Sequence, residues 1–195
     1  GEYNATNIEG GNPGSKSVFP ATFFSDFTYS AKVKVKSDGD AGLIFRASRL
    51  SFGADEYNGY YVGISSSAKR VELGKSTGAW NSLQIADMDI VPDQWYNVKI
   101  VAKGANIKVY VNDMVTPKID YNNATFTSGS VGVRAYRARA VWDDISVISA
   151  SGTRIISGKN AEDINLYPNP VESNLMVSVP NNGFMTIYNI SGKQM

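Results

Sequence analysis

The sequence of 195 residues contains no cysteine and no histidine. Without cysteine the chain has no disulfide bonds and no thiol nucleophile, and without histidine it has no imidazole-based triad and none of the common zinc sites. No apolar run approaches the length of roughly 20 residues that a membrane-spanning helix requires. The N-terminus has no basic region followed by an apolar stretch, as a secretory signal would have. We expect no membrane insertion, and we expect the chain to be a piece of a longer protein.

An excess of positive charge is missing as well. The 19 Lys and Arg residues nearly balance the 18 Asp and Glu residues, for a net charge of +1. Domains that bind nucleic acid carry clustered positive charge, so no nucleic acid partner is expected. Glutamate is scarce in the middle of the chain, where only Glu56 and Glu72 occur. Glycoside hydrolysis needs two carboxylates about 5 to 10 Å apart. The scarcity favours binding without catalysis, and no catalytic residue is predicted.

Glycine and tyrosine are abundant, with 18 and 11 residues, and the chain consists of many short segments of alternating apolar and polar residues. In the segment 23–36, for example, hydrophobic residues alternate with a row of lysines. Strands of this kind at intervals of about ten residues, with turn residues between them, indicate an all-β, two-sheet antiparallel sandwich. We assign residues 1–149 to this sandwich, residues 150–163 to a Ser, Gly and Lys-rich linker, and residues 164–195 to a short β appendage.

The hairpin Ala41–Ile64 is the segment most typical of a ligand-binding surface. Its alternation places Arg46 and Tyr61 together on the outer face of two adjacent strands. A guanidinium beside a phenol suits a polyhydroxylated ligand, because Arg is a rigid fork of donors and Tyr is a flat ring with a hydroxyl. The alternative is a structural cation–π or salt-bridge pair. The expected core residues of the hairpin are Leu43, Phe45, Val62 and Ile64.

Other polar and aromatic residues extend this hypothesis to a sugar site. Asp55 and Tyr57 lie in the loop of the hairpin, where a carboxylate accepts hydroxyl hydrogen bonds and a ring forms a wall; solvated loop charge is the alternative. Arg134 is expected on the same face as Arg46, where it could contact the sugar. The alternative is that the arginines of this segment pair with nearby Asp residues. Trp80 follows a glycine turn, where it is either an exposed stacking platform for a sugar or a buried residue at the rim of the site. The predicted sugar-binding residues are Arg46, Asp55, Tyr57, Tyr61, Trp80, Arg134 and Arg137.

A structural calcium ion is the one cofactor we consider. Asp143 and Asp144 begin the last strand of the sandwich, and Asp26 lies near the start of an early one. The first and last strands of such sandwiches are often neighbours, so these carboxylates could share Ca²⁺ with backbone carbonyls. Consecutive aspartates that cap a turn are the alternative.

Seven segments of the sandwich resemble those of the concanavalin A-like lectin and glucanase superfamily, in the same order. They are D-F-T-Y-S-A-K-V-K-V (26–35), A-G-L-I-F-R-A (41–47), Y-N-G-Y-Y-V-G-I (57–64), Q-W-Y-N-V-K-I-V (94–101), I-K-V-Y-V-N-D (107–113), G-S-V-G-V-R (129–134) and W-D-D-I-S-V (142–147). The order looks like that of fructan-binding carbohydrate-binding modules and of 3-keto-disaccharide hydrolase-like domains. The resemblance covers about residues 20–149 and implies a jelly-roll sandwich that binds an oligo- or polysaccharide. Paired glutamates in the E-x-D-x-x-E pattern of the superfamily's glucanases are missing.

The C-terminal segments I-N-L-Y-P-N-P-V-E-S-N-L (164–175) and T-I-Y-N-I-S-G-K (186–193) resemble the C-terminal sorting domain of the type IX secretion system of Bacteroidota. Because that family continues with further strands, we expect a truncated sorting domain here. The resemblance implies the type IX machinery as a partner and a parent protein exported across the outer membrane, either secreted or held at the cell surface.

Together these observations predict a monomeric, non-catalytic carbohydrate-binding module that tethers an attached polysaccharide-degrading enzyme to its glycan. One alternative is a glycoside hydrolase of the 3-keto-disaccharide type. The other is an adhesin-like sandwich that binds protein, for which a large exposed apolar patch would be expected.

Overall fold

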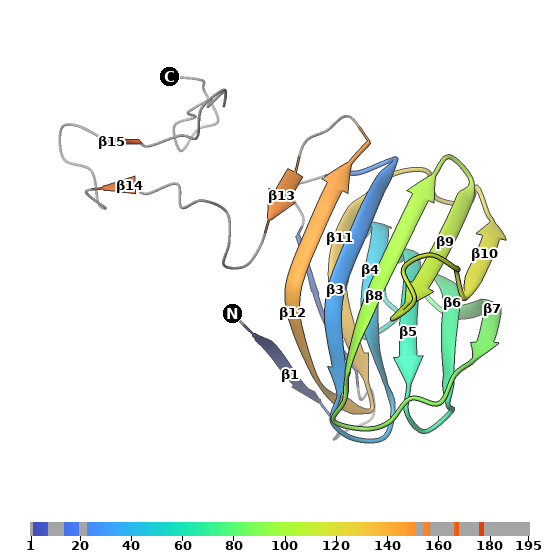
Figure 1. The fold of residues 1–195 in the computed structure, drawn as a ribbon. Coiled ribbons are helices and arrows are strands. Elements are labelled where there is room, and N and C mark those ends of the chain that lie inside the picture. The colour runs from blue at the N-terminus through green and yellow to red at the C-terminus, as the bar shows by residue number, and fades with distance from the viewer. Residues whose placement is uncertain are drawn as a thin grey trace. The chain divides into compact units, whose positions relative to one another are not determined.

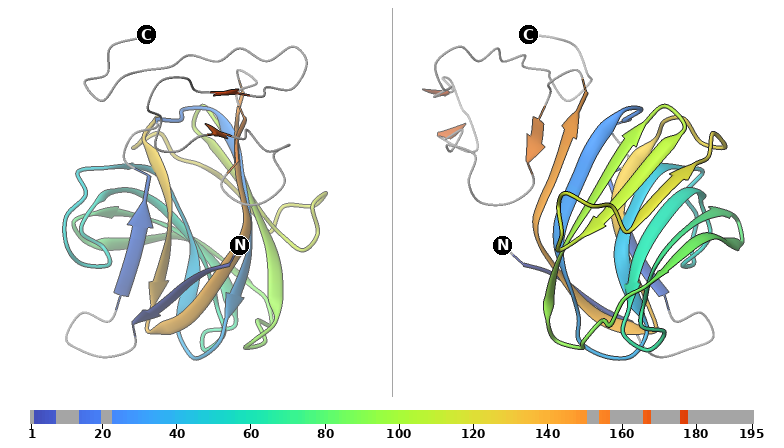
Figure 2. Two further views of the ribbon diagram at one scale, coloured as in Figure 1. Left: turned by 90° about the vertical axis from the view of Figure 1, so that its left-hand side faces the viewer. Right: turned by 45° about the vertical axis from the view of Figure 1, so that its right-hand side comes forward.

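The structure is a computed structural model that describes residues 2–7, 14–19, 23–150, 154–156, 166–167 and 176–177. The chain divides into two units, Gly1–Gly158 and Lys159–Met195. The described part of the first unit consists of strands and connecting segments without a helix, arranged as two antiparallel sheets that pack face to face (Figures 1 and 2). The predicted all-β, two-sheet sandwich is therefore confirmed.

Each sheet combines strands from distant parts of the sequence. The first sheet has the order β1 (Tyr3–Asn7), β12 (Ala138–Ser149), β3 (Phe27–Val35), β8 (Trp95–Lys103), β9 (Asn106–Val111) and β10 (Ile119–Asn122), and β13 (Arg154–Ile156) pairs with β12. The second sheet has the order β2 (Gly14–Val18), β11 (Ser130–Tyr136), β4 (Asp40–Ser48), β5 (Asn58–Ser65), β6 (Arg70–Thr77) and β7 (Trp80–Asp87). The described residues form no helix that is long and apolar enough to cross a membrane.

The period-two alternation explains the core. In β3 every second residue, from Phe27 to Val35, is buried between the sheets, while the lysines of this strand lie on the outer face. The four core residues predicted for the hairpin Ala41–Ile64 are all completely buried. Two polar bonds join the sheets across this apolar layer: the Trp142 indole N–H donates to the Gly42 carbonyl (3.2 Å), and the Tyr29 hydroxyl donates to the Gly132 carbonyl (2.9 Å).

The predicted linker, residues 150–163, contains one short strand. Residues Arg154–Ile156 form β13, which pairs in antiparallel register with residues 146–148 of β12. Ile155 and Ile156, the apolar pair of the predicted linker, belong to this strand. In the second unit β14 (Leu166–Tyr167) pairs with β15 (Met176–Val177). The segment 186–193, which resembles part of the sorting domain, lies outside the described residues.

Candidate functional site

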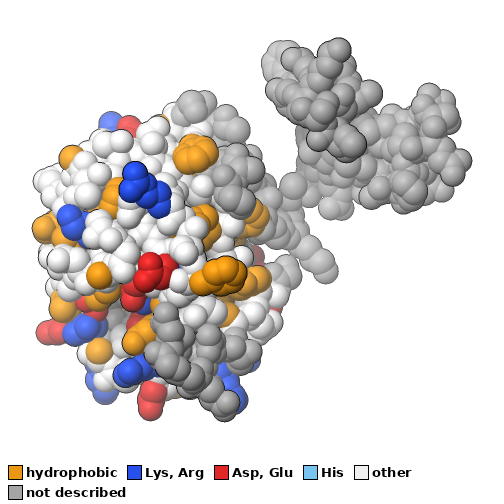
Figure 3. Space-filling model, turned by 180° about the vertical axis from the view of Figure 1, so that it is seen from behind, with side chains coloured by type: hydrophobic (Ala, Val, Ile, Leu, Met, Phe, Trp, Pro, Cys, Tyr) orange, Lys and Arg blue, Asp and Glu red, His pale blue; other side chains and the backbone are white. Residues whose placement is uncertain are grey.

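A pocket of about 270 Å³ opens on the outer face of the second sheet. Seen from behind (Figure 3), the molecule presents acidic and basic side chains close together, with hydrophobic side chains around them. The pocket contains four of the predicted sugar-binding residues, Asp55, Tyr61, Trp80 and Arg134. Its complete lining is Asp40, Asp55, Tyr61, Gly63, Ser65, Arg70, Glu72, Trp80, Arg134 and Tyr136.

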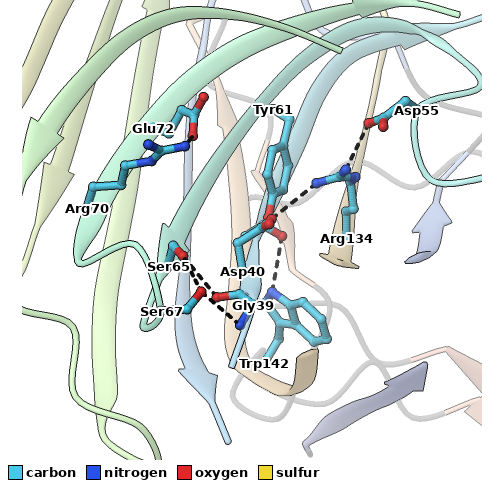
Figure 4. A network of polar contacts seen from close by, with 11 residues as sticks. Gly39, Asp40, Asp55, Tyr61, Ser65, Ser67, Arg70, Glu72, Arg134 and Trp142 are labelled. Atoms are coloured by element: carbon cyan, nitrogen blue, oxygen red, sulfur yellow. Dashed lines mark hydrogen bonds and ion pairs between the residues drawn. The ribbon is translucent and has the colours of Figure 1, made fainter. Parts of the chain in front are cut away.

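Arg134 is the charged centre of the pocket. It follows the core residue Val133 on β11, so its side chain points to the outer face, and it is only 5% exposed. One guanidinium nitrogen, Nη1, bonds Asp40 Oδ1 at 3.2 Å, and the other, Nη2, bonds Asp55 Oδ1 at 2.8 Å (Figure 4). Burial disfavours the charged guanidinium, but Tyr61 and the two carboxylates outweigh it and raise the pKa of Arg134 above its ordinary value.

Three aromatic rings enclose the same guanidinium. Its Cζ atom lies 4.5 Å from the centre of the Tyr61 ring, 5.2 Å from that of Tyr136 and 5.7 Å from that of Trp80. Trp80 in turn packs edge-on against Tyr61 at 5.7 Å. Cation–π attraction and two ion pairs therefore fix the plane of the Arg134 side chain before any ligand arrives.

Two glycines leave room for the rings of Tyr61 and Trp80 against the sheet. A Cβ atom added at Gly63 would lie 2.7 Å from the Tyr61 ring, and one added at Gly74 would overlap the Trp80 ring. Neither glycine needs an unusual backbone angle; what matters is the missing side chain. Both rings thus pack closely over bare backbone and give the pocket an aromatic surface for the apolar faces of small ligands.

The remaining polar groups give the pocket both acceptors and donors. The Tyr61 hydroxyl donates to Asp40 Oδ1 at 2.6 Å, and Arg70 pairs with Glu72 at 2.6 Å on the β6 side. Burial raises the pKa of Tyr61 well above its usual value, so the phenol stays a neutral donor at physiological pH. Burial also raises the pKa of Asp40, although Arg134 and the Tyr61 hydroxyl act in the opposite direction.

Lys16, on β2, holds the loop that carries Asp55. Its ammonium donates to the carbonyls of Ser51 (2.7 Å) and Gly53, and the hydroxyl of Ser76 donates to the carbonyl of Asp55. Partial burial lowers the pKa of Lys16 from its usual value. Sequence reasoning missed this residue, because nothing local marks a lysine that acts on a loop 35 residues away.

The predicted position of Arg46 is wrong. Arg46 is completely buried, and its guanidinium donates to the carbonyls of Ser25 (3.0 and 2.6 Å) and Phe126 (3.1 Å) and approaches Asp26 at 3.7 Å. The pairing of β4 with both neighbours shifts here, and Arg46 has a φ of 50°. This β-bulge breaks the alternation that placed Arg46 beside Tyr61, so its side chain leaves the outer face.

Tyr57 and Arg137 also lie outside the lining of the pocket. Tyr57 is 1% exposed and belongs to a small apolar cluster with Ile44, Ala47 and Tyr61 on the outer face of the second sheet. Its hydroxyl is buried and has no hydrogen-bond partner among the described residues. Arg137 is exposed and lies 5.4 Å from the centre of the Tyr136 ring, at the edge of the site.

Changing Tyr57 to Phe is expected to raise the free energy of unfolding by about 1 kcal/mol, because it removes a desolvated hydroxyl and keeps the ring. Chemical denaturation would measure the change. The matched control is Tyr29→Phe, which removes a buried hydroxyl that is hydrogen-bonded to Gly132 and should lower the free energy of unfolding by a similar amount. A loss of stability in the Tyr57 variant would contradict this account of its hydroxyl.

The three aspartates of the predicted calcium site do not come together. β12 and β3 are indeed neighbours, but Asp143 is opposite Lys32, whereas Asp26 precedes Phe27, which is opposite Ser149. Six residues along β3 correspond to about 20 Å. Asp144 instead pairs with Lys32 at 2.7 Å, and Asp26 accepts the Gly104 N–H. Within the described ranges no group of three acidic side chains is placed to hold a metal ion.

Asp40, Arg70, Glu72 and Tyr136 complete the pocket, although they were not among the predicted site residues. A signal existed for two of them: Arg70 and Glu72 alternate with the buried Val71 and Leu73, which puts both on the outer face of β6. Asp40 has no such signal, and only the register that sets it opposite Tyr136 reveals its place beside Arg134.

Residues 6–148 match the family described as the 3-keto-alpha-glucoside-1,2-lyase-like domain. The chain belongs to this family. Residues 165–195 match the secretion system C-terminal sorting domain. Both resemblances noted in the sequence are confirmed, and the sorting domain indicates export by the type IX system to the cell surface or the medium.

Relatives and solved structures add a carbohydrate connection. The chain is 26% identical over 136 residues to a levanase from Bacillus sp. (strain L7) and 25% identical over 142 residues to a levanase from Bacillus subtilis (strain 168). These matches cover 69% and 71% of this chain but only 14% and 20% of the two levanases. The carbohydrate-binding module CBM66 from Bacillus subtilis superposes with a TM-score of 0.64 at 25% identity, covering 75% of this chain and 91% of the module. The fold is that of a carbohydrate-binding jelly roll.

Proposed function

We propose that the sandwich is a non-catalytic carbohydrate-binding module and that the pocket around Arg134 is its sugar site. The observation that carries this proposal is the fixed guanidinium between two carboxylates and three rings. Sugar hydroxyls both donate and accept hydrogen bonds, and the pocket presents acceptors on Asp40 and Asp55 beside donors on Arg134 and Arg70. The rings of Trp80 and Tyr136 suit the apolar C–H faces of a sugar.

The ion pairing of the pocket carboxylates supports binding over catalysis. Asp40 and Asp55 share one guanidinium, and Glu72 pairs with Arg70. A glycosidase needs one protonated carboxyl group to act as a general acid and a second carboxylate placed opposite it. Burial raises the pKa of Asp40, but its pairing with Arg134 acts in the opposite direction, and each of the three carboxylates is engaged by an arginine as a hydrogen-bond acceptor, the role that binding of hydroxyl groups requires.

The levanase relatives suggest the ligand and the setting. The region shared with them is a small part of each enzyme, as expected of an accessory module, so levan is the first glycan that we propose. In the parent protein the module would keep an attached polysaccharide-degrading domain near its substrate and so raise the substrate concentration that this domain meets. Export through the sorting domain would place both at the glycan.

Isothermal titration of the purified chain with levan, inulin, plant cell-wall glycans and alginate tests the proposal. Saturable binding of levan without release of reducing sugar is the expected result. Failure of a folded sample to bind any of these glycans would contradict it. Release of sugar from 3-keto-disaccharides that is lost on Glu72→Gln would instead identify a hydrolase or lyase.

A further inference from the structure

A second hollow lies next to the pocket on the second sheet. It has a volume of about 570 Å³ and is lined by β2 and by the loop between β4 and β5, including Lys16, Leu50 and residues 51–53. Lys16 is the register partner of Arg134 across the β2 and β11 pair. The hollow and the Arg134 pocket are therefore neighbours on the second sheet.

One loop forms the wall between the two depressions. Asp55 faces the Arg134 pocket, while Ser51, Phe52 and Gly53 of the same loop face the hollow. Lys16 bonds the loop at Ser51 and Gly53, and the main-chain N–H of Ser51 donates to the Glu56 carbonyl at 2.9 Å. The wall is thus tied down at several points, so that the two depressions keep a fixed spacing.

Phe52 gives the hollow an aromatic surface that the fold does not use. Its side chain is 98% exposed, and Leu50 beside it is 40% exposed. An aromatic ring left almost entirely in water stabilises nothing in the free protein and offers its full face to a ligand. The rest of the lining mixes apolar and polar groups: the side chains of Val18 and Leu50 lie beside two loop carbonyls and the ammonium of Lys16, which has three donors and uses two of them on the loop.

We infer that the hollow is a second sugar subsite, occupied by the units that follow the one held in the Arg134 pocket. Phe52 stacks on a sugar face, and the third N–H of Lys16 donates to a sugar hydroxyl. The inference rests on the proposed function. It favours a glycan over a protein partner because the hollow lies beside the proposed sugar pocket and sets a single exposed ring next to the ammonium of Lys16, the two kinds of group that stack on a sugar face and donate to a sugar hydroxyl.

Titration with levan-derived oligosaccharides of one to six fructose units tests the subsite. The affinity of the unchanged chain is expected to rise about tenfold between the one-unit and the four-unit ligand, as expected when a second contact is linked to the first. In Phe52→Ala this increase should disappear while the affinity for the one-unit ligand stays the same. Val115→Ala is the control, since Val115 is 86% exposed in the β9–β10 loop of the first sheet; it should keep the full increase.

The outcomes separate this inference from the proposed function. Binding that does not depend on chain length would overturn the second subsite and leave the Arg134 pocket as a sugar site. An increase with chain length that survives Phe52→Ala, or an equal loss of affinity for every length, would also overturn it. Absence of binding at every length, in a sample whose thermal unfolding is cooperative, would overturn both.

Discussion

Arg134→Met is expected to lower the affinity for levan by at least about 100-fold, the largest effect of any single change in the site. The variant removes the hydrogen-bond donors of Arg134 from the pocket, and it leaves Asp40 and Asp55 without the guanidinium that holds them. It also removes the cation between Tyr61, Tyr136 and Trp80. Isothermal titration would measure the loss.

In this variant the loss in the free energy of unfolding should be smaller than the loss in the free energy of sugar binding. The side chains of Asp40 and Asp55 are 26% and 28% exposed, so water can partly solvate them when Arg134 is absent. Arg137→Met is the matched control, because it makes the same chemical change to an exposed arginine that lies over the Tyr136 ring and does not line the pocket. Equal losses of affinity in the two variants would place the sugar outside the Arg134 pocket.

Arg46→Ala is expected to reduce the free energy of unfolding by about 3 kcal/mol or more, since it removes the hydrogen bonds of a completely buried side chain and leaves a cavity in its place. The guanidinium donates to the carbonyls of Ser25 and Phe126, and neither of these residues lines the pocket. Denaturation by urea would measure the loss, and the affinity for sugar of the remaining folded protein should not change.

The chain contains a control for the backbone of this site. Arg49, at the end of the same hairpin strand, also has a positive φ (48°, against 50° for Arg46), but it is exposed. Arg49→Ala therefore repeats the change of side chain at a similar backbone angle without a buried partner, and it should alter stability by less than about 0.5 kcal/mol. A weaker affinity in Arg46→Ala with unchanged stability would restore the original prediction that Arg46 contacts the ligand.

The contrast between Arg46 and Arg134 shows what alternation can predict. Both arginines follow a core residue, Phe45 or Val133, and a strict period of two puts both on the outer face. The rule holds for Arg134 and fails for Arg46, because a bulge depends on the pairing of β4 with two neighbours and has no local signature in A-G-L-I-F-R-A. The core of the hairpin was predictable, since burial on one sheet face sets the alternation directly.

Residues that act over long distances in the sequence were not predictable. Asp55, Tyr61, Trp80 and Arg134 stood out because each is a polar or aromatic residue of a strand or loop with its own pattern. Lys16 and Asp40 gain their roles only from the registers that set them against β11. The predicted calcium site failed for the same reason: the neighbouring strands were correct, but the register separated the carboxylates.

Because Lys16 holds the loop that carries Asp55 from the edge strand β2, the site depends on when β2 joins the sheet during folding. The register pair of Lys16 and Arg134 joins the N-terminal part of the sandwich to one of its last strands. Contacts of such high sequence separation require the closure of long loops, and chains dominated by them fold slowly. The wall that carries Asp55 is complete only after β2 has docked. Recovery of sugar affinity during refolding should therefore lag behind the burial of Trp142, which a stopped-flow experiment can resolve.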